Sequence, residues 1–151
     1  MYQTNVFDPW LIVSQIICVQ GLYYASLSFL LFLCSLFSSV PLSIDQVFDP
    51  LVLVTLKSPA GRVALFAFLA NAAVLGAFHL YVVVERAKKC LDHAATVHLL
   101  HFFLCALLRG VPSRAMWYVV VTLATVSMSV LGERLCMKKE LRNIPRGFQH
   151  V

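Results

Sequence analysis

Four long stretches without a charged side chain constrain the fold of this chain more than any other feature of its sequence. No Asp, Glu, Lys or Arg occurs in residues 9–44, 63–84, 93–108 or 115–132. An α-helix needs about 20 mostly apolar residues to cross about 30 Å of hydrocarbon. The four stretches therefore predict four membrane-spanning helices, of which the third is the shortest.

The composition excludes a soluble globular domain. Hydrophobic residues make up 60% of the 151 residues and charged residues only 13%, whereas soluble domains are about 45–50% apolar and about 25% charged. The charge needed to cover a water-facing surface is missing, so we expect the lipid bilayer to surround the chain. We predict an all-α, polytopic membrane protein: a four-transmembrane-helix bundle in one membrane domain, residues 1–151.

Charges and prolines set the predicted boundaries within this domain. The first uncharged stretch is too short for two spans and a turn, so we treat it as one long helix. The predicted segments are spans at about 10–37, 62–84, 90–109 and 115–133, a long loop at 38–61, a short loop at 85–92 and a tail at 134–151. Pro41, Pro50 and Pro59 argue against one regular helix through the long loop. The tail is expected to continue the fourth helix for a turn or two.

The basic residues predict the orientation of the bundle. With four spans, both termini and the 85–92 loop lie on one side of the membrane. That side carries eight Lys and Arg residues: Arg86, Lys88, Lys89, Arg134, Lys138, Lys139, Arg142 and Arg146. The other side carries four: Lys57, Arg62, Arg109 and Arg114. Because basic residues are enriched on the cytosolic side, we expect both termini in the cytosol and the 38–61 loop in the lumen.

The net charge of +5 does not require a nucleic-acid partner. Basic residues cluster at the ends of the predicted spans, where they meet anionic lipid head groups. We therefore expect the lipid bilayer, and no nucleic acid, to be the partner of these charges.

Small residues recur at helical spacing and predict the faces through which the helices pack. In the first span they are Ser14, Cys18, Gly21, Ala25 and Ser28. In the second they are Ala70, Ala73 and Ala77, and in the fourth Thr122, Thr125, Ser129 and Gly132. The lining of a pore is the alternative for these faces. Tyr23 and Tyr24 fall in the middle of the first span, so their hydroxyls need partners inside the bundle.

Three histidines in the third span are the candidates for ligand chemistry. His98 and His101 are three residues apart and share a helix face, and neutral imidazoles in this arrangement can bind zinc, copper or haem iron. A metal site needs three or four ligands, and His79 and Glu133 are the extra partners that other helices offer. The interpretation we favour is that the histidine side chains hydrogen-bond across helices or reach the membrane interface. We predict no cofactor and no metal, with His98 and His101 as the weak metal candidates.

The sequence lacks the motifs of common enzymes. No GxSxG, HExxH, Gly-rich phosphate loop or paired-carboxylate set occurs, so we expect no enzymatic activity. Cys90 and Cys136 lie at the predicted cytosolic boundary, where cysteines can be palmitoylated. A free thiol is the interpretation we favour at both positions.

A series of short motifs runs along the chain in a defined order. In order, they include Phe7-Asp8-Pro9, Ser14-Gln15-Ile16, Tyr23-Tyr24, Asp45-Gln46, Gly61-Arg62, Asn71-Ala72, Cys90-Leu91-Asp92, Thr96-Val97-His98, His101, Gly132-Glu133, Leu135-Cys136-Met137 and Ile144-Pro145. Each motif is short, but their joint order is specific. This order and spacing resembles the Sys family of Golgi integral membrane proteins over about residues 7 to 145.

This resemblance implies a four-span Golgi membrane protein, chiefly of the trans-Golgi network. It also implies a receptor for an Arf-related small GTPase, whose capture leads to recruitment of golgin tethers and supports vesicle-mediated protein traffic. The family supplies no residue-level binding site that could be transferred. We therefore predict the partner-binding residues from their cytosolic position: Arg86, Lys88, Lys89, Lys138, Lys139 and Arg142.

Two alternative functions remain open from the sequence. A small transporter or channel is motivated by the polar side chains within the spans, namely Gln15, Gln20, Asn71 and the histidines. An intramembrane metal-binding protein would use His98 and His101. A homo-oligomer is compatible with each of these functions.

Overall fold

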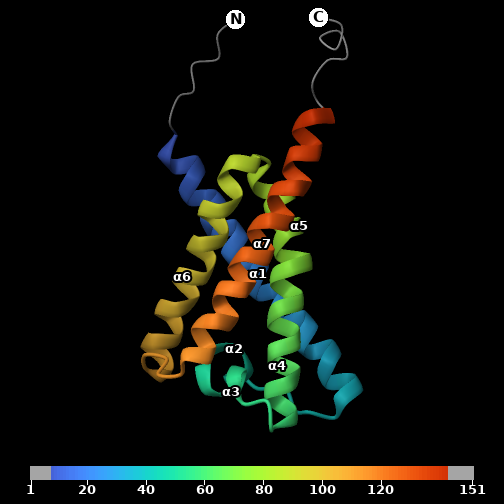
Figure 1. Ribbon diagram of the computed structural model, residues 1–151, viewed down its shortest axis with the longest axis vertical. Coiled ribbons are helices and arrows are strands. Elements are labelled where there is room, and N and C mark those ends of the chain that lie inside the picture. The colour runs from blue at the N-terminus through green and yellow to red at the C-terminus, as the bar shows by residue number, and fades with distance from the viewer. Residues whose placement is uncertain (1–7, 143–151) are drawn as a thin grey trace, which may run out of the picture.

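The computed structural model describes residues 8–142, and its elements in this range are helices joined by short loops (Figure 1). Four helices are long and apolar enough to cross a membrane. They are α1 (Pro9–Ser38), a second helix over Pro59–Val84, a third over Ala87–Arg109, and α7 (Ala115–Arg142). The predicted all-α, four-transmembrane-helix bundle is thus confirmed.

Two of the four long helices are built from several segments. The second consists of α4 (Pro59–Ala70), η1 (Asn71–Gly76), α5 (Ala77–His79) and η2 (Leu80–Val84), in which η1 and η2 are π-helical turns. The third consists of the 3₁₀ turn η3 (Ala87–Lys89) and α6 (Cys90–Arg109).

Local signals explain where the first two long helices begin. Proline is tolerated in the first helical turn because its missing N–H would be unpaired there. Pro9 begins α1, and the Asp8 carboxylate accepts from the backbone N–H groups of Trp10 and Leu11 at 3.1 and 3.3 Å. Pro59 begins α4 in the same way, with the hydroxyl of Ser58 accepting from the backbone N–H of Gly61 at 3.0 Å.

The first described residues of α1 and the last turns of α7 lie at the same end of the bundle, which we call the termini end (Figure 1). The opposite end, called the loop end, carries two short helices, α2 (Asp45–Phe48) and α3 (Pro50–Val54). The segment from 38 to 61 is therefore not one regular helix, as its prolines predict. Pro50 itself begins α3.

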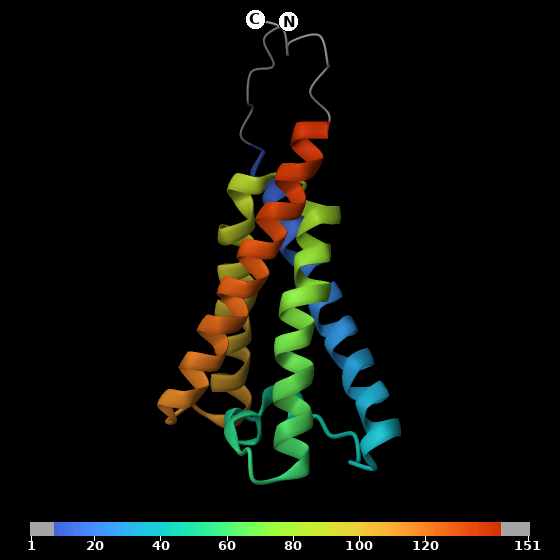
Figure 2. The ribbon, with the colours of Figure 1, turned by 45° about the vertical axis from the view of Figure 1, so that its right-hand side comes forward.

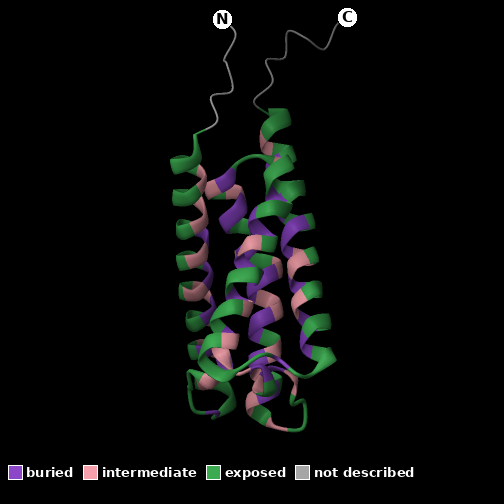
Figure 3. Cartoon of the chain, turned by 90° about the vertical axis from the view of Figure 1, so that its left-hand side faces the viewer, coloured by how far each residue is buried: buried purple, intermediate pink, exposed green. Residues whose placement is uncertain are grey.

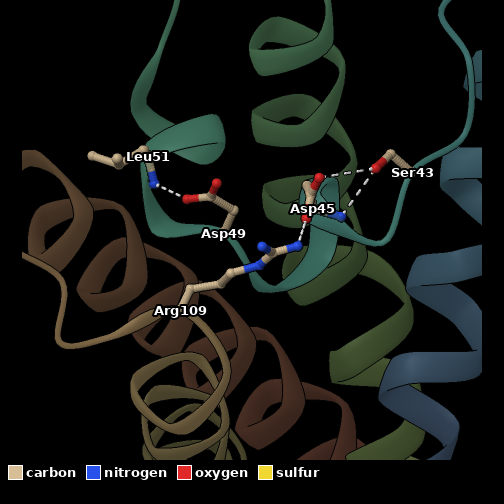
Figure 4. Close-up of polar contacts among 5 residues, drawn as sticks. All are labelled: Ser43, Asp45, Asp49, Leu51 and Arg109. Atoms are coloured by element: carbon tan, nitrogen blue, oxygen red, sulfur yellow. Dashed lines mark hydrogen bonds and ion pairs between the residues drawn. The ribbon is translucent and has the colours of Figure 1, made fainter.

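An ion pair holds α2 against the end of the third helix. Arg109, the last residue of α6, pairs with Asp45 at the start of α2 (Figure 4). The neighbouring Asp49 caps α3, because its carboxylate accepts from the backbone N–H of Leu51 at 2.8 Å. Both partners of the ion pair are partly exposed, so we expect it to contribute less than about 1 kcal/mol.

The fourth helix continues past the end of its predicted span at 133, as expected for the first part of the tail. It remains helical to Arg142, since the sequence has no proline between the span and Pro145. The rest of the predicted tail, residues 143–151, lies outside the described residues, as does the start of the chain up to residue 7.

The outside of the bundle is apolar and the inside is closely packed. Large hydrophobic side chains such as Trp10, Phe29 and Phe66 are exposed around the circumference, as lipid contact requires. Figure 3 shows the buried residues collected between the helices and the exposed ones facing outward. The core includes Tyr23 of α1 and Trp117 of α7, both almost fully buried.

The predicted packing face of α1 is wrong. All five of its small residues (Ser14, Cys18, Gly21, Ala25 and Ser28) are exposed. The helix instead buries Val19, Tyr23, Leu27 and Leu31. The mid-span tyrosine explains this choice, since its hydroxyl must be turned toward a polar partner within the bundle. In α7 the prediction holds for Ser129 and Gly132, which are buried, but not for Thr122, which is exposed.

Candidate functional site

A cluster of polar side chains joins three of the four long helices in the middle of the bundle. The Tyr23 hydroxyl of α1 lies 3.4 Å from Nε2 of His98 on α6, and both side chains are buried. The other ring nitrogen of His98, Nδ1, lies 2.9 Å from the carbonyl oxygen of Ala94. A carbonyl only accepts, so in the neutral imidazole Nδ1 carries the proton, Nε2 accepts, and Tyr23 donates.

The neighbouring tyrosine makes a parallel contact one helical turn further along α6. The Tyr24 hydroxyl lies 3.1 Å from Nδ1 of His101. Nε2 of the same ring lies 3.5 Å from the thiol of Cys105. The expectation that both tyrosine hydroxyls find partners inside the bundle is therefore met, and the partners are the two histidines that share a helix face.

Asn71 ties the second helix to α1. Its side-chain N–H₂ donates to the backbone carbonyl of Tyr23 at 3.1 Å, and its side-chain oxygen accepts from the Ser26 hydroxyl at 2.7 Å. Near the termini end, Gln15 of α1 donates to the carbonyl of Val83 in η2 at 3.2 Å. Both amides thus bridge helices.

Three polar side chains within the described helices have buried atoms without a hydrogen-bond partner there. Both amide atoms of Gln20 and Nδ1 of His79 are buried and unpaired among the described residues. The buried His93 has a partner for one ring nitrogen only. Its Nδ1 lies 2.9 Å from the carbonyl oxygen of Lys89, while its Nε2 has no partner in residues 8–142.

The histidines are not gathered into a metal site in the part of the chain that the structure describes. No group of three or more His, Cys, Asp or Glu side chains in residues 8–142 is arranged to hold a metal ion. His98 and His101 instead face the two tyrosines. Both rings also pack against Phe68: the His98 ring lies edge-on with its centroid 5.9 Å from that of Phe68, and the His101 ring is tilted at 5.4 Å.

The predicted partner-binding residues meet at the termini end, in two segments. Arg86 lies between the second and third helices, Lys88 and Lys89 lie in η3 at the start of the third, and Lys138, Lys139 and Arg142 lie on the last turns of α7. We call the turn 85–89 together with α7 residues 134–142 the basic end. The sequence alone does not show that the two segments lie together, because the hydrogen bonds between them join residues more than fifty positions apart.

Two acidic side chains hold the basic end together. Glu85 forms an ion pair with Lys139, and the Glu140 carboxylate accepts from the backbone N–H of Ala87 at 3.1 Å. Lys139 also lies 4.9 Å from the ring of Tyr81. Lys139 is therefore used within the molecule, whereas the other five predicted residues are exposed.

A pair of thiols underlies the basic end. The Sγ atoms of Cys90 and Cys136 lie 3.5 Å apart, and both cysteines are fully buried. Cys136 also contacts the carbonyl oxygen of Leu80 at 3.7 Å. Both thiols are free, but neither is accessible for acylation in this conformation, which speaks against palmitoylation at the two positions. Their irregular spacing in the sequence gave no sign of this contact.

Comparison with known proteins identifies the family of this bundle. Residues 2–146 match the family model described as SYS1, integral membrane protein S linking to the trans Golgi network. The chain is 42% identical over 144 residues to a protein named SYS1 homolog from Dictyostelium discoideum, covering 95% of this chain and 61% of that protein. It is 37% identical over 143 residues to a SYS1 homolog from Nematostella vectensis, covering 95% of this chain and 90% of that protein.

The chain thus spans less than two thirds of the Dictyostelium relative and most of the Nematostella one. No solved structure shows a significant match. The family match extends over nearly the whole chain, both ends of the bundle and the buried polar cluster included, and it agrees with the resemblance carried by the short motifs. The chain belongs to the SYS1 family of integral membrane proteins.

Proposed function

We propose that this protein is a Golgi membrane receptor that recruits an Arf-related small GTPase to its cytosolic face. Through that GTPase it would support golgin recruitment and vesicle-mediated protein traffic at the trans-Golgi network. The observation that carries the proposal is membership of the SYS1 family, whose description links it to this compartment. The GTPase partner is what the motif resemblance implies.

The basic end is the part of the molecule we assign to GTPase binding. Lys138 and Arg142 are four residues apart on α7, so they share one exposed helix face. Arg86, Lys88 and Lys89 are exposed on the adjoining turn. Clustered positive charge favours fast association with an acidic surface and selects its orientation. The same charges, by the positive-inside rule, support a cytosolic position for this end.

Affinity capture of the full chain tests the proposal. The tagged protein is solubilised gently from Golgi membranes and probed for an Arf-related GTPase locked with GTP or with GDP. We expect one nucleotide state to be enriched over the other, because a receptor or effector distinguishes the two. Equal background binding in both states, with the protein correctly located, would contradict a receptor function.

Charge reversal then tests the assigned surface. The double variant Lys138→Glu/Arg142→Glu should reduce capture by about tenfold, which corresponds to about 1.4 kcal/mol of binding free energy. The matched control is Lys57→Glu/Arg114→Glu, which reverses two exposed charges at the loop end. An equal loss in both variants, or no loss in either, would remove the binding site from the basic end without removing the receptor function.

A further inference from the structure

An open groove lies at the loop end, between the last turns of α1 and the first turns of α4. Its volume is about 350 Å³. Its walls are mainly apolar and include Phe37, Val63 and Phe66, with the small Cys34 between them. Arg62 is the charged member of its lining. The groove opens to the outside of the bundle and hence to the surrounding lipid.

The groove exists because α1 leaves the bundle before it ends. Leu31 is the last buried residue of α1, and Phe37 near the end of the helix is 89% exposed. Figure 2 shows the last turns of α1 diverging from α4 at this end. Exposed apolar surface of this kind marks an interaction site, and its aromatic walls suit an occupant with an apolar part.

The charge of Arg62 has no acidic partner among the described residues. Its guanidinium donates to the backbone carbonyls of Leu56 and Lys57 at 3.2 and 3.4 Å, which orient it but carry no negative charge. The ion pairs within residues 8–142 involve other cations, Arg109 and Lys139. The exposed Lys57, whose backbone carbonyl accepts from this guanidinium, adds a second positive charge beside the groove.

We infer that this groove binds one glycerophospholipid of the bilayer, with an acyl chain between Phe37 and Phe66 and the phosphate on Arg62. The apolar walls match the acyl chain, and the uncompensated guanidinium matches the phosphate. Arginine presents a planar fork of donors that binds phosphate in a bidentate manner. Arg62 lies in the first turn of its span, which is the depth at which head groups meet a membrane helix.

The bound lipid completes the contact between α1 and α4 that the protein itself lacks at the loop end. This role is independent of the GTPase partner and of which side of the membrane the loop end faces. The site therefore succeeds or fails separately from the proposed receptor function.

Native mass spectrometry of the purified full chain in detergent tests the inference. Dioleoylphosphatidylglycerol is titrated, with dioleoylglycerol as the lipid that has the same chains and no phosphate. We expect one molecule of the phospholipid to be retained and at least tenfold less diacylglycerol. Added inorganic phosphate should not displace the lipid, because the acyl chain contributes to its binding. Equal retention of the two lipids would overturn the assignment of the phosphate to Arg62.

Variants separate the head-group contact from the groove. Arg62→Gln should lower phospholipid retention about tenfold, Arg62→Lys should restore part of it, and Cys34→Trp should block the groove while leaving Arg62 in place. Arg114→Gln, which removes an exposed charge at the loop end outside the groove, is the control and should retain lipid like the unaltered protein. If Arg62→Gln does not fold, the Cys34→Trp variant decides. Unchanged retention in a folded Arg62→Gln or Cys34→Trp variant would refute the site.

Discussion

Asn71 is a buried polar residue that links two of the long helices. It is fully buried where α4 passes into the π-helical turn η1, and it hydrogen-bonds both the carbonyl of Tyr23 and the hydroxyl of Ser26. Inside a membrane such groups have no water to replace a lost partner. Asn71 therefore fixes where α1 lies along the second helix.

Replacing Asn71 by leucine should destabilise the bundle. The change leaves the Ser26 hydroxyl and the Tyr23 carbonyl without this partner, and we expect a loss of about 1–3 kcal/mol in the free energy of unfolding. Reversible unfolding in mixed micelles measures it. Ser14→Ala is the control, since that exposed hydroxyl bonds only the Leu11 carbonyl of its own helix. Equal stability of the two variants would show that Asn71 does not hold the helices together.

The sequence predicted the need of the tyrosines for partners but not the partners themselves. A mid-span hydroxyl must be paired, which follows from Tyr23 and Tyr24 alone, and the spacing of His98 and His101 places both imidazoles on one face. Which helices face each other, and at what height, depends on packing across the bundle. The contact between Cys90 and Cys136 could not be predicted for the same reason, because it depends on how two helices pack.

At the scale of elements, the sequence predicted the membrane spans better than the faces through which they pack. Uncharged length is enough to recognise a membrane helix, and four were found where four were expected. Small residues on α1 indicated a packing face, but the five positions point outward. Pairing of the buried tyrosines outweighs close approach of backbones here, because an unpaired hydroxyl costs more than the modest gain from small-residue packing.

Gly61 lies where the start of α4 packs against the end of α3, and this contact does depend on a small residue. A Cβ atom added at Gly61 would overlap the backbone oxygen of Thr55, at the end of α3. The backbone there cannot yield as a flexible side chain would. At Gly21 an added Cβ meets nothing within 4 Å.

Gly61→Ala should therefore destabilise the protein while Gly21→Ala should not. We expect a loss of about 1–3 kcal/mol for Gly61→Ala, typical of overpacking, and little change or a slight gain for Gly21→Ala, because alanine is the better helix former. Thermal unfolding of the two purified variants in the same detergent measures the difference. A tolerated Gly61→Ala would mean that α3 does not pack on the start of α4 as described.

At the scale of the whole molecule, the orientation in the membrane decides which end can meet a cytosolic partner. The larger number of basic residues at the termini end favours a cytosolic position for it. Two acidic residues at that end, Glu85 and Glu140, connect the 85–89 turn to α7. The loop end has fewer basic residues and one of them, Arg109, is paired with Asp45.

Protease protection in sealed Golgi vesicles tests this orientation. An epitope at the C-terminus should be digested without detergent, because it faces the outside of the vesicle. An epitope inserted between Leu42 and Ser43, in the exposed connection before α2, should be digested only after detergent opens the membrane. The reverse pattern would place the basic end in the lumen and would rule it out as a docking surface for a cytosolic GTPase.

The pairing of α1 with α6 also has a consequence for how the protein is made. The histidines that pair with Tyr23 and Tyr24 lie 75 and 77 residues further along the chain and are synthesised later. At a synthesis rate of about 5–20 residues per second, the delay is roughly 4 to 15 seconds. During that time the first helix has left the ribosome, but the two imidazoles that pair with its phenol groups have not yet been made. Biogenesis of this protein therefore includes an interval in which the insertion machinery, or water within it, must shelter the first helix until the third one arrives.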